Sequence, residues 1–189
     1  MSRASRADAA LHREEVVAAT SRLLRERGAA DVSVQEAMAA AGLTHGGFYK
    51  HFASKNELIA LAAGTAFGDI EDTLDRIAAE SPDAATARER VVDEYLTTDH
   101  RDTPGTGCAN TALAADAART DDPALRAAYV EGVQRTLARL ESIEHSSEGH
   151  TRALADLIVL VGGLTLARAT AGDPISEEIL RVARGLLEP

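Results

Sequence analysis

The most informative part of the sequence is residues 44–55, which read Thr44-His45-Gly46-Gly47-Phe48-Tyr49-Lys50-His51-Phe52-Ala53-Ser54-Lys55. Thr44 predicts the N-cap of a short helix that carries two glycines in its first turn and then presents Tyr, Lys and His side chains. Ser54 predicts the cap of another helix, which starts immediately afterwards. Small residues at a helix N-terminus, followed by hydroxyl and cationic side chains, suit an element that contacts a phosphate-lined groove.

Two further helices are expected before this stretch, and together with it they predict a helix-turn-helix. Apolar residues at spacings of three and four predict a first helix over about residues 11–28. Ser33 predicts the cap of a second helix, and Glu36, three residues later, is placed to complete a capping box. Gly42 is expected to end this second helix, and a tight turn then leads into a third helix over Thr44–Phe52.

The rest of the chain also predicts helices, so the expected fold class is all-α. Apolar residues make up 45% of the chain and aromatic residues only 3%, which favours a helical core of small aliphatic side chains. The segment 100–107 predicts a loop from its Pro and Gly content. Further helices are expected at about 54–80, 84–98, 108–119, 123–145, 148–171 and 176–187, which gives about nine in the whole chain.

Charge is distributed unevenly along the chain. The formal net charge is -10, yet residues 1–60 carry eight Lys and Arg against seven Asp and Glu. The only two lysines of the sequence, Lys50 and Lys55, both lie in the stretch quoted above. This asymmetry is compatible with an N-terminal part that faces DNA and an acidic C-terminal part.

No sequence feature predicts a membrane-spanning or secreted protein. The longest apolar run, residues 157–164, is much shorter than the about 20 residues that span a bilayer. Residues 1–6 lack the apolar stretch of a secretory signal, and a single cysteine excludes an internal disulfide framework. We therefore expect a soluble, cytoplasmic protein that makes no membrane contact.

Residues Glu14–Ile59 closely resemble the N-terminal DNA-binding domain of TetR-family transcriptional regulators. The resemblance rests on the helix-turn-helix pattern over residues 33–52, on its Gly-x-x-Tyr-x-His-Phe core and on the helix opened by Ser54. It implies an all-α chain in two parts. These are a three-helix DNA-binding domain over residues 1–53 and a ligand-binding and dimerisation domain over residues 54–189, connected by the helix from Ser54.

The short helix after the turn would be the recognition helix of such a domain, with its N-terminal residues at base edges in the major groove. His45 is therefore expected to read a base, whereas Tyr49 and the two lysines are expected to bind backbone phosphates. Phe48 and Phe52 are expected to pack inward. The alternative is an ordinary helical corner whose glycines only permit close packing. The residues expected to contact DNA are Ser33, Thr44, His45, Gly46, Gly47, Tyr49, Lys50, His51 and Lys55.

The resemblance also implies the partners of the protein: a double-stranded DNA operator, a small-molecule effector and a second copy of the chain, with no cofactor. We expect a repressor that leaves a pseudo-palindromic operator when a small apolar or amphipathic effector binds. Helical phase and the layout of the family together point to the effector pocket. Its expected residues are Phe67, Ile70, Leu74, Tyr95, Cys108, Asn110, Leu113, Tyr129 and Val133.

The last two predicted helices have wide apolar faces, which indicate pairing with the same helices of a second chain. The alternative is that these faces only close the core of the monomer. The residues expected at the dimer interface are Leu154, Leu157, Ile158, Val161, Leu164, Ile179, Val182 and Leu186.

Cys108 begins the predicted helix 108–119 and leaves a second interpretation open. A thiol at a helix N-terminus lies at the positive end of the helix dipole and can react with oxidants or electrophiles. The sequence favours a buried, small apolar residue instead, because no neighbouring Lys or His partner can be identified from it.

The sequence contains no catalytic motif, so an enzyme is not expected. A helical enzyme or ligand carrier with a non-functional N-terminal part is the remaining alternative. Glu141, His145 and Glu148 could meet as metal ligands, but the Ser and Gly residues beside them favour a loop with solvated charge. No metal site is therefore expected.

Overall fold

The computed structural model describes residues 3–144 and 149–188, and every regular element in these two ranges is a helix. The expected all-α class is confirmed. None of the described helices is long and apolar enough to cross a membrane. Two of the elements are short 3-10 helices, η1 (His45–Lys50) and η2 (Pro104–Thr106). The α-helices are α1 (Arg3–Arg27), α2 (Val34–Ala40), α3 (Lys55–Glu80), α4 (Ala84–Tyr95), α5 (Thr98–Asp102), α6 (Ala109–Arg119), α7 (Pro123–Glu144), α8 (Gly149–Ala169) and α9 (Pro174–Leu187).

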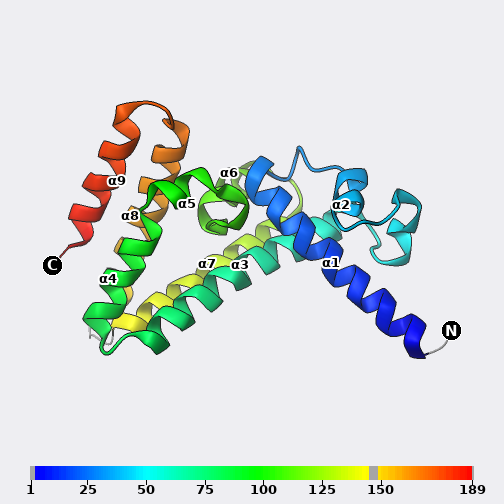
Figure 1. Cartoon of the computed structure of the whole chain (residues 1–189), viewed down its shortest axis with the longest axis horizontal. Coiled ribbons are helices and arrows are strands. Elements are labelled where there is room, and N and C mark those ends of the chain that lie inside the picture. The colour runs from blue at the N-terminus through cyan, green and yellow to red at the C-terminus, as the bar shows by residue number, and fades with distance from the viewer. Residues whose placement is uncertain (1–2, 145–148, 189) are drawn as a thin grey trace.

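The molecule is elongated, with the N-terminal helices at one end and the C-terminal pair at the other (Figure 1). Helices α3 and α7 run side by side through the middle and join the two ends. Helix α1 packs on α3 beside α2 and η1, whereas α4, α8 and α9 form the opposite end. The element that carries the quoted stretch therefore projects at one end of the molecule, away from the C-terminal helices.

The N-terminal end forms the expected helix-turn-helix, and its capping residues determine where the helices begin and end. Helix α1 ends at Gly28, whose φ of 83° is a left-handed conformation that glycine adopts without strain. Ser33 caps α2 through the predicted capping box, in which the Ser33 hydroxyl and the Glu36 carboxylate each accept the other residue's backbone N–H. Gly42, with a φ of 72°, then turns the chain toward η1.

The predicted third helix is shorter than expected and is a 3-10 helix. It covers His45–Lys50 instead of Thr44–Phe52, and Thr44 stands at its N-cap. Two consecutive glycines have low α-helix propensity, and the buried rings of Phe48 and Phe52 hold the segment from its inner side. The low helix propensity of the two glycines and the packing of the two buried rings therefore both favour this tighter turn.

Helix α3 begins directly behind η1. Ser54 caps it as expected, with its hydroxyl accepting the N–H of Glu57 at 3.1 Å. The Glu57 carboxylate accepts the N–H of Ala53 at 2.6 Å, and this bond lowers the pKa of Glu57 below its ordinary value. These two bonds fix the start of α3 relative to the end of the helix-turn-helix.

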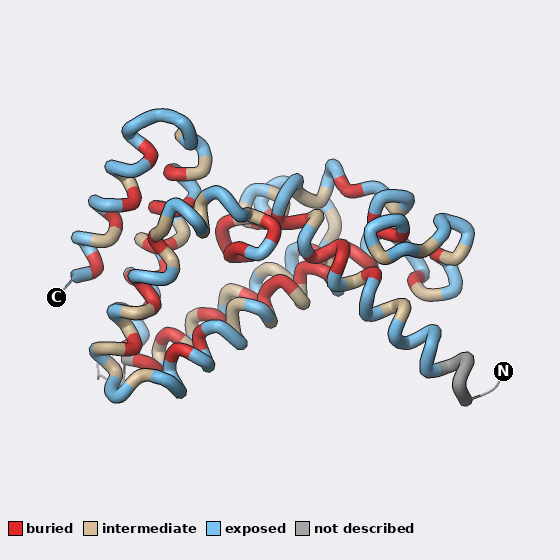
Figure 2. The backbone as a smooth tube through the Cα atoms, viewed as in Figure 1, coloured by how far each residue is buried: buried red, intermediate tan, exposed pale blue. Residues whose placement is uncertain are grey.

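The apolar core consists of two clusters of buried residues (Figure 2). The first cluster contains Met38 and Phe48 of the N-terminal helices together with Phe67 of α3 and Leu113 of α6. The second cluster joins α4, α8 and α9 to the distal ends of α3 and α7. Because the first cluster continues across position 53–54, the division into residues 1–53 and 54–189 stays a prediction.

The segment 100–107 is not the open loop that its Pro and Gly content predicts. The preceding helix α4 ends at Tyr95, and Thr97 then caps α5, its hydroxyl accepting the N–H of His100 at 3.0 Å. Helix η2 follows, and Gly105 and Gly107 are both buried. The Pro and Gly residues therefore form a compact connection of two short helices packed against the rest of the molecule.

Candidate functional site

Helix η1 presents polar side chains outward over an aromatic base. Phe48 and Phe52 are 1% and 2% exposed, and their rings stack with centroids 5.4 Å apart. Tyr49 is 80% exposed, and the side chain of Lys50 also lies on the surface. The inward packing expected for the two phenylalanines is confirmed, and it leaves the two residues that follow Phe48 facing solvent.

Arg13 of α1 holds the end of η1 in place. Its Nε donates to the carbonyl of His51 at 3.1 Å, and its Nη2 lies 2.9 Å from a carboxylate oxygen of Glu57. The guanidinium also lies over the ring of Phe52, 5.1 Å from the ring centroid, in a cation–π contact. The orientation of η1 is thus set by one side chain of α1.

The nine predicted DNA contacts lie at three places on this end of the molecule. Ser33 stands at the N-terminus of α2, where its hydroxyl donates to the Glu36 carboxylate at 2.7 Å and is therefore already bonded. Lys55 is half-buried at the start of α3. The others lie on or beside η1, with Gly47 and His51 half-buried and with exposed Thr44, His45, Gly46, Tyr49 and Lys50.

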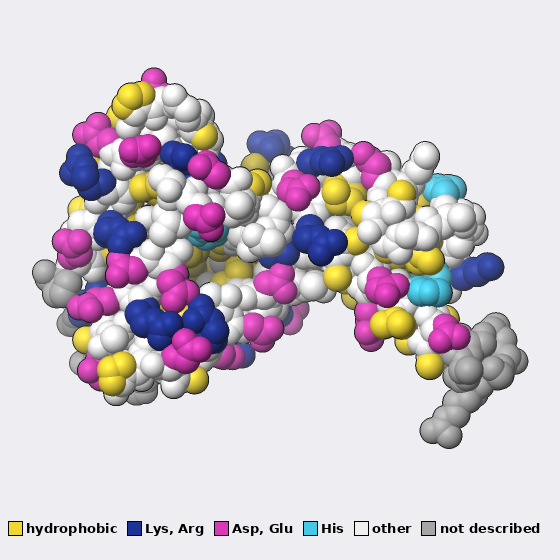
Figure 3. All heavy atoms as spheres, viewed as in Figure 1, with side chains coloured by type: hydrophobic (Ala, Val, Ile, Leu, Met, Phe, Trp, Pro, Cys, Tyr) yellow, Lys and Arg dark blue, Asp and Glu magenta, His cyan; other side chains and the backbone are white. Residues whose placement is uncertain are grey.

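Part of the positive charge at this end is paired within the molecule. Arg13, Arg25 and Arg27 each form an ion pair with a carboxylate. Lys50 and Lys55 form no ion pair with any residue that the structure describes. Figure 3 shows Lys or Arg and His side chains gathered at the tip that carries η1. These two lysines therefore lie where the sequence predicts contact with phosphate, and exposed Arg22 of α1 is a further cation without an ion pair to a described residue.

The part of the molecule beyond the helix-turn-helix, called the body below, contains a cavity of about 200 Å³. It is lined by α3, α4, the α5–η2 segment and the residue before α6. Figure 3 shows the surface hollowed in the middle of the molecule, where α3 and α4 diverge. Helix α3 contributes aliphatic side chains together with the polar Asp69 and Thr73, and the other elements contribute further polar groups. The lining residues are Asp69, Ile70, Thr73, Leu74, Ile77, Val91, Glu94, Tyr95, His100, Thr106, Gly107 and Cys108.

Four of the nine predicted pocket residues line this cavity: Ile70, Leu74, Tyr95 and Cys108. The other five do not, because α7 packs directly on α3 and α6 and turns their side chains into a neighbouring cluster. The Phe67 ring, for example, meets the Tyr129 ring edge-on at 5.6 Å between centroids. The predicted pocket residues that do not line this cavity are Phe67, Asn110, Leu113, Tyr129 and Val133.

His100 organises the polar side of the cavity and was not predicted from the sequence. Its Nδ1 lies 2.8 Å from the Tyr95 carbonyl, and its Nε2 accepts the backbone N–H of Cys108 at 3.0 Å. An accepting Nε2 and a donating Nδ1–H require the neutral ring. Burial lowers the pKa of His100 below its ordinary value, with a smaller contribution from the Arg168 charge. Burial and the bond that Nε2 accepts from Cys108 therefore favour neutral imidazole, whereas the bond to the Tyr95 carbonyl opposes them in part.

The hydroxyl of Tyr95 and the thiol of Cys108 complete this polar side. The Tyr95 hydroxyl lies 3.1 Å from Thr111 Oγ1, and burial raises the pKa of Tyr95 well above its ordinary value. The Asn110 amide nitrogen lies 3.6 Å from Cys108 Sγ and 3.3 Å from Thr136 Oγ1. The cavity thus offers hydrogen-bonding groups at one end and aliphatic walls at the other, which is typical of a small-molecule site.

Some of the missed lining residues could have been found from the sequence. Thr73 and Ile77 follow Ile70 at spacings of three and seven on one helix, so helical phase alone places them on the same face. His100 and Gly107 have no such signal, because their positions depend on how α5 and η2 fold back over α3.

Helices α8 and α9 expose apolar side chains along one face, as expected for an interface. Leu157 and Leu164 need correction, because both are buried in the core of the single chain and cannot contact a second copy. Leu166 and Ile175 are exposed and were not predicted. The predicted residues that remain exposed or half-buried are Leu154, Ile158, Val161, Ile179, Val182 and Leu186.

The described residues contain no group of three or more His, Cys, Asp or Glu side chains that could hold a metal ion. Of the three residues weighed as metal ligands, His145 and Glu148 lie outside the described ranges. Glu141 instead pairs with His150 across the end of α7 and the start of α8.

The chain is similar to known proteins both in sequence and in fold. Residues 16–62 match the sequence model of the family described as bacterial regulatory proteins, tetR family. A TetR-family transcriptional regulator from Cytophaga hutchinsonii superimposes with a TM-score of 0.79 at 19% identity, covering 95% of this chain and 94% of that chain. The reduced form of NemR from E. coli gives a TM-score of 0.78 at 19% identity, covering 94% of this chain and 95% of that one.

A more distant solved structure holds a ligand. FadR from Bacillus subtilis in complex with stearoyl-CoA gives a TM-score of 0.69 at 14% identity, with 92% of this chain and 96% of that chain covered. None of the curated proteins matches the chain. The whole described chain therefore shares its fold with these solved regulators.

Proposed function

We propose that this chain, which carries the DNA-binding domain of the tetR family and has the fold of TetR-family transcriptional regulators, is a repressor controlled by a small molecule. The proposal rests on the occurrence of two features in the same chain. Exposed His45, Tyr49 and Lys50 stand on η1 above a buried aromatic base, and a separate cavity of about 200 Å³ lies in the body.

In the proposed DNA complex, η1 enters the major groove of the operator. His45 stands at the N-terminal end of η1 and reads a base edge. Tyr49 and Lys50 donate to backbone phosphates from the same element, and Lys55 adds charge from the start of α3. Because these are few contacts on a chain with a net charge of -10, one copy alone binds weakly.

Pairing of two copies through the exposed faces of α8 and α9 overcomes this weakness. The dimer presents two η1 elements, which occupy successive major grooves of a pseudo-palindromic operator, roughly 34–36 Å or a multiple of that apart. An effector in the cavity binds better to a dimer conformation in which the distance between the two η1 elements does not match the operator. Effector binding therefore releases the DNA. Aliphatic walls with Tyr95 and His100 at one end suit a small amphipathic effector.

The test is binding to the DNA immediately upstream of the protein's own coding sequence. A fragment of that DNA is expected to be retarded in a gel at low salt and to be released as salt concentration rises, because phosphate contacts displace counterions. A protein that retards neither this fragment nor any other DNA would be a ligand carrier or an enzyme, and the proposal would fail. Reporter transcription with and without the protein separates a repressor from an activator that uses the same DNA contacts.

A second candidate, a regulator that senses electrophiles or oxidants through a thiol, is favoured by the position of Cys108. This sole cysteine lines the cavity, and the Asn110 amide approaches its sulfur at 3.6 Å. Addition of the thiolate to N-ethylmaleimide is then expected to release DNA from the wild type and not from Cys108→Ser. Equal release from both proteins would exclude this thiol as the sensor.

A further inference from the structure

Arg25 of α1 is a buried cation whose partners both belong to the cavity wall. Its side chain is 3% exposed. One guanidinium nitrogen, Nη2, lies 2.8 Å from Asp69 Oδ2, and the other, Nη1, donates to the Gly107 carbonyl at 3.3 Å. The remaining nitrogen, Nε, has no hydrogen-bond partner among the described residues. Among the described residues, only the Asp69 carboxylate and the Gly107 carbonyl bond to this guanidinium.

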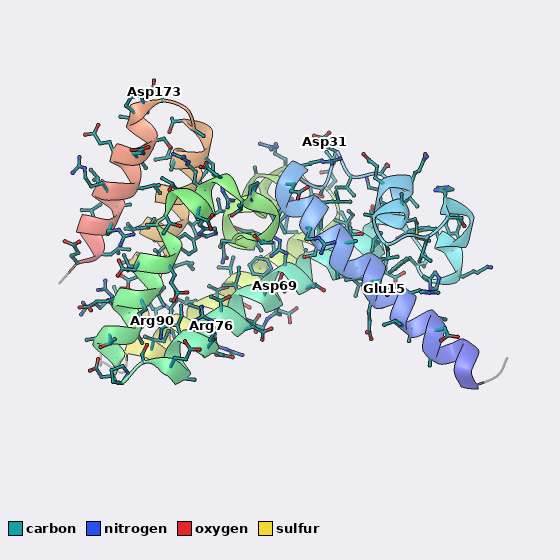
Figure 4. The ribbon with its side chains drawn as sticks, in the orientation of Figure 1. Glu15, Asp31, Asp69, Arg76, Arg90 and Asp173 are labelled. Atoms are coloured by element: carbon teal, nitrogen blue, oxygen red, sulfur yellow. The ribbon has the colours of Figure 1, made fainter. Side chains whose placement is uncertain are left out.

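Both of these groups are accessible to a molecule in the cavity. Asp69 and Gly107 are lining residues, and the side chain of Asp69 is 51% exposed. Asp69 Oδ1 has no partner within the described part of the chain. In Figure 4 the labelled Asp69 lies on α3 close to where α1 crosses it. A cavity occupant that contacts Asp69 or displaces η2 changes the surroundings of Arg25 directly.

Helix α1 is closely packed against the η2 segment as well. A Cβ at Gly105 would collide with the side chain of Glu26, which follows Arg25 in the chain. The exposed Glu26 side chain could turn aside, so the proximity shows only that η2 lies directly against α1, with which it is in contact. The cavity wall and the C-terminal end of α1 therefore pack directly against each other.

The other end of the same helix holds the DNA-contacting element. Arg13 and Arg25 are twelve residues apart on α1, about 18 Å at the α-helical rise of 1.5 Å per residue. Arg13 binds the His51 carbonyl and covers Phe52, as described above. An uninterrupted helix thus carries one arginine at the cavity wall and another at η1.

We propose that Arg25 is the positioning residue that couples the cavity to η1 through α1. A buried guanidinium that loses a partner is strongly destabilised, so α1 follows any rearrangement of Asp69 and Gly107. Movement of α1 then displaces Arg13 and, with it, η1. The regulatory meaning of this coupling rests on the proposed function, whereas the coupling itself is a property of the chain without DNA or effector.

Hydrogen exchange measured by mass spectrometry on the full chain tests the coupling. Arg25→Gln and Asp69→Asn are compared with Arg22→Gln, which removes a charge from an exposed position of the same helix. The first two variants are expected to accelerate amide exchange in residues 104–113 and also in residues 45–52. An increase of roughly fivefold, the lower end of measured coupling between sites, is expected at η1. Arg22→Gln is expected to leave both segments unchanged.

Acceleration confined to residues 104–113, or no acceleration in either segment, would overturn the proposal and leave Arg25 a local clamp. If circular dichroism shows that Arg25→Gln does not fold, Asp69→Asn decides, because Asp69 is half exposed and its amide keeps the shape of the side chain. Failure of the proposed function would appear differently, as wild-type protein that binds no DNA while the exchange of the two segments remains coupled.

Discussion

Phe48 and Tyr49 meet edge-on with their ring centroids 5.1 Å apart, yet Phe48 is 1% exposed and Tyr49 is 80% exposed. A buried ring thus supports its exposed neighbour from below, and the Tyr49 hydroxyl is held away from the protein surface. An exposed aromatic ring with no apolar partner above it contributes little to folding. In the proposed complex this exposed ring and its hydroxyl contact DNA.

Tyr49→Phe is expected to weaken DNA binding about tenfold on every sequence, because it removes one hydrogen bond to a charged phosphate and keeps the ring. Fluorescence anisotropy with two unrelated operator-like fragments measures the effect. A loss on one fragment only would instead assign Tyr49 to base reading.

Lys55→Ala is expected to lower the salt dependence of DNA binding by about one unit of slope in log affinity against log salt concentration, because one phosphate contact is lost. Arg76→Ala is the control, since it removes the same charge from the distal part of α3, in the ion-pair group labelled in Figure 4. Equal slopes for Lys55→Ala and the control would remove Lys55 from the interface.

His45→Ala is expected to change which bases are preferred and not only the affinity. His45 is exposed at the N-terminal end of η1, where side chains reach base edges in the major groove. Selection of bound fragments from a randomised pool measures the preference of each protein. An unchanged preference at uniformly lower affinity would show that His45 binds phosphate.

The helix-turn-helix was predictable because its signals are local. Ser33 and Glu36 sit three residues apart, and a capping box needs nothing more than that spacing. The 3-10 form of η1 was not predictable, since Gly46 and Gly47 specify no helix type and the turn is set by Phe48 and Phe52 packing on other elements. The starts of α2 and α3 therefore followed from neighbours in sequence, whereas the extent and the form of η1 followed from neighbours in space.

The cavity was only partly predictable for the same reason. Helical phase places Ile70 and Leu74 on the inward face of α3, but it does not say which element covers that face. Phe67 lies on the same helix and is covered by α7, so it belongs to the core. His100 reaches the cavity only because Thr97 starts a new helix within the predicted helix 84–98, and that new helix continues into the segment predicted as a loop.

Ile158→Asp is expected to convert the protein from dimer to monomer at micromolar concentration. Ile158 is 63% exposed in the single chain and lies on the apolar face of α8, where a carboxylate buried against a second copy would lack a partner. Val130→Asp, at an exposed apolar position of α7, is the matched control. Sedimentation that finds wild-type protein monomeric, or a dimer unaffected by Ile158→Asp, would reject this interface.

The free energy of unfolding is expected to fall as pH is lowered from 7.5 to 5.5, and His100 is expected to cause part of the fall. Burial holds the pKa of His100 below its ordinary value of 6.5, so the unfolded chain takes up a proton more readily than the folded chain. The contribution of His100 is therefore complete above the unfolded pKa and is lost as pH falls through the folded one. Protonation would also place an N–H against the Cys108 amide.

Urea unfolding at several pH values measures this dependence. His100→Gln is expected to have a lower free energy of unfolding at pH 7.5 and a flatter pH dependence down to pH 5.5, since an amide does not titrate. Glu57, whose pKa is lowered from 4.5, stays ionised over this range and does not interfere. A variant whose pH dependence equals that of the wild type would show that His100 titrates alike in both states.

The central claim is that two copies of η1 read adjacent major grooves, and hydroxyl-radical footprinting on the upstream DNA tests it most directly. We expect two protected half-sites with related sequences, roughly 34–36 Å or a multiple of that apart, and loss of both footprints in Ile158→Asp at the same protein concentration. A single protected segment without internal symmetry, or protection that Ile158→Asp retains in full, would contradict it.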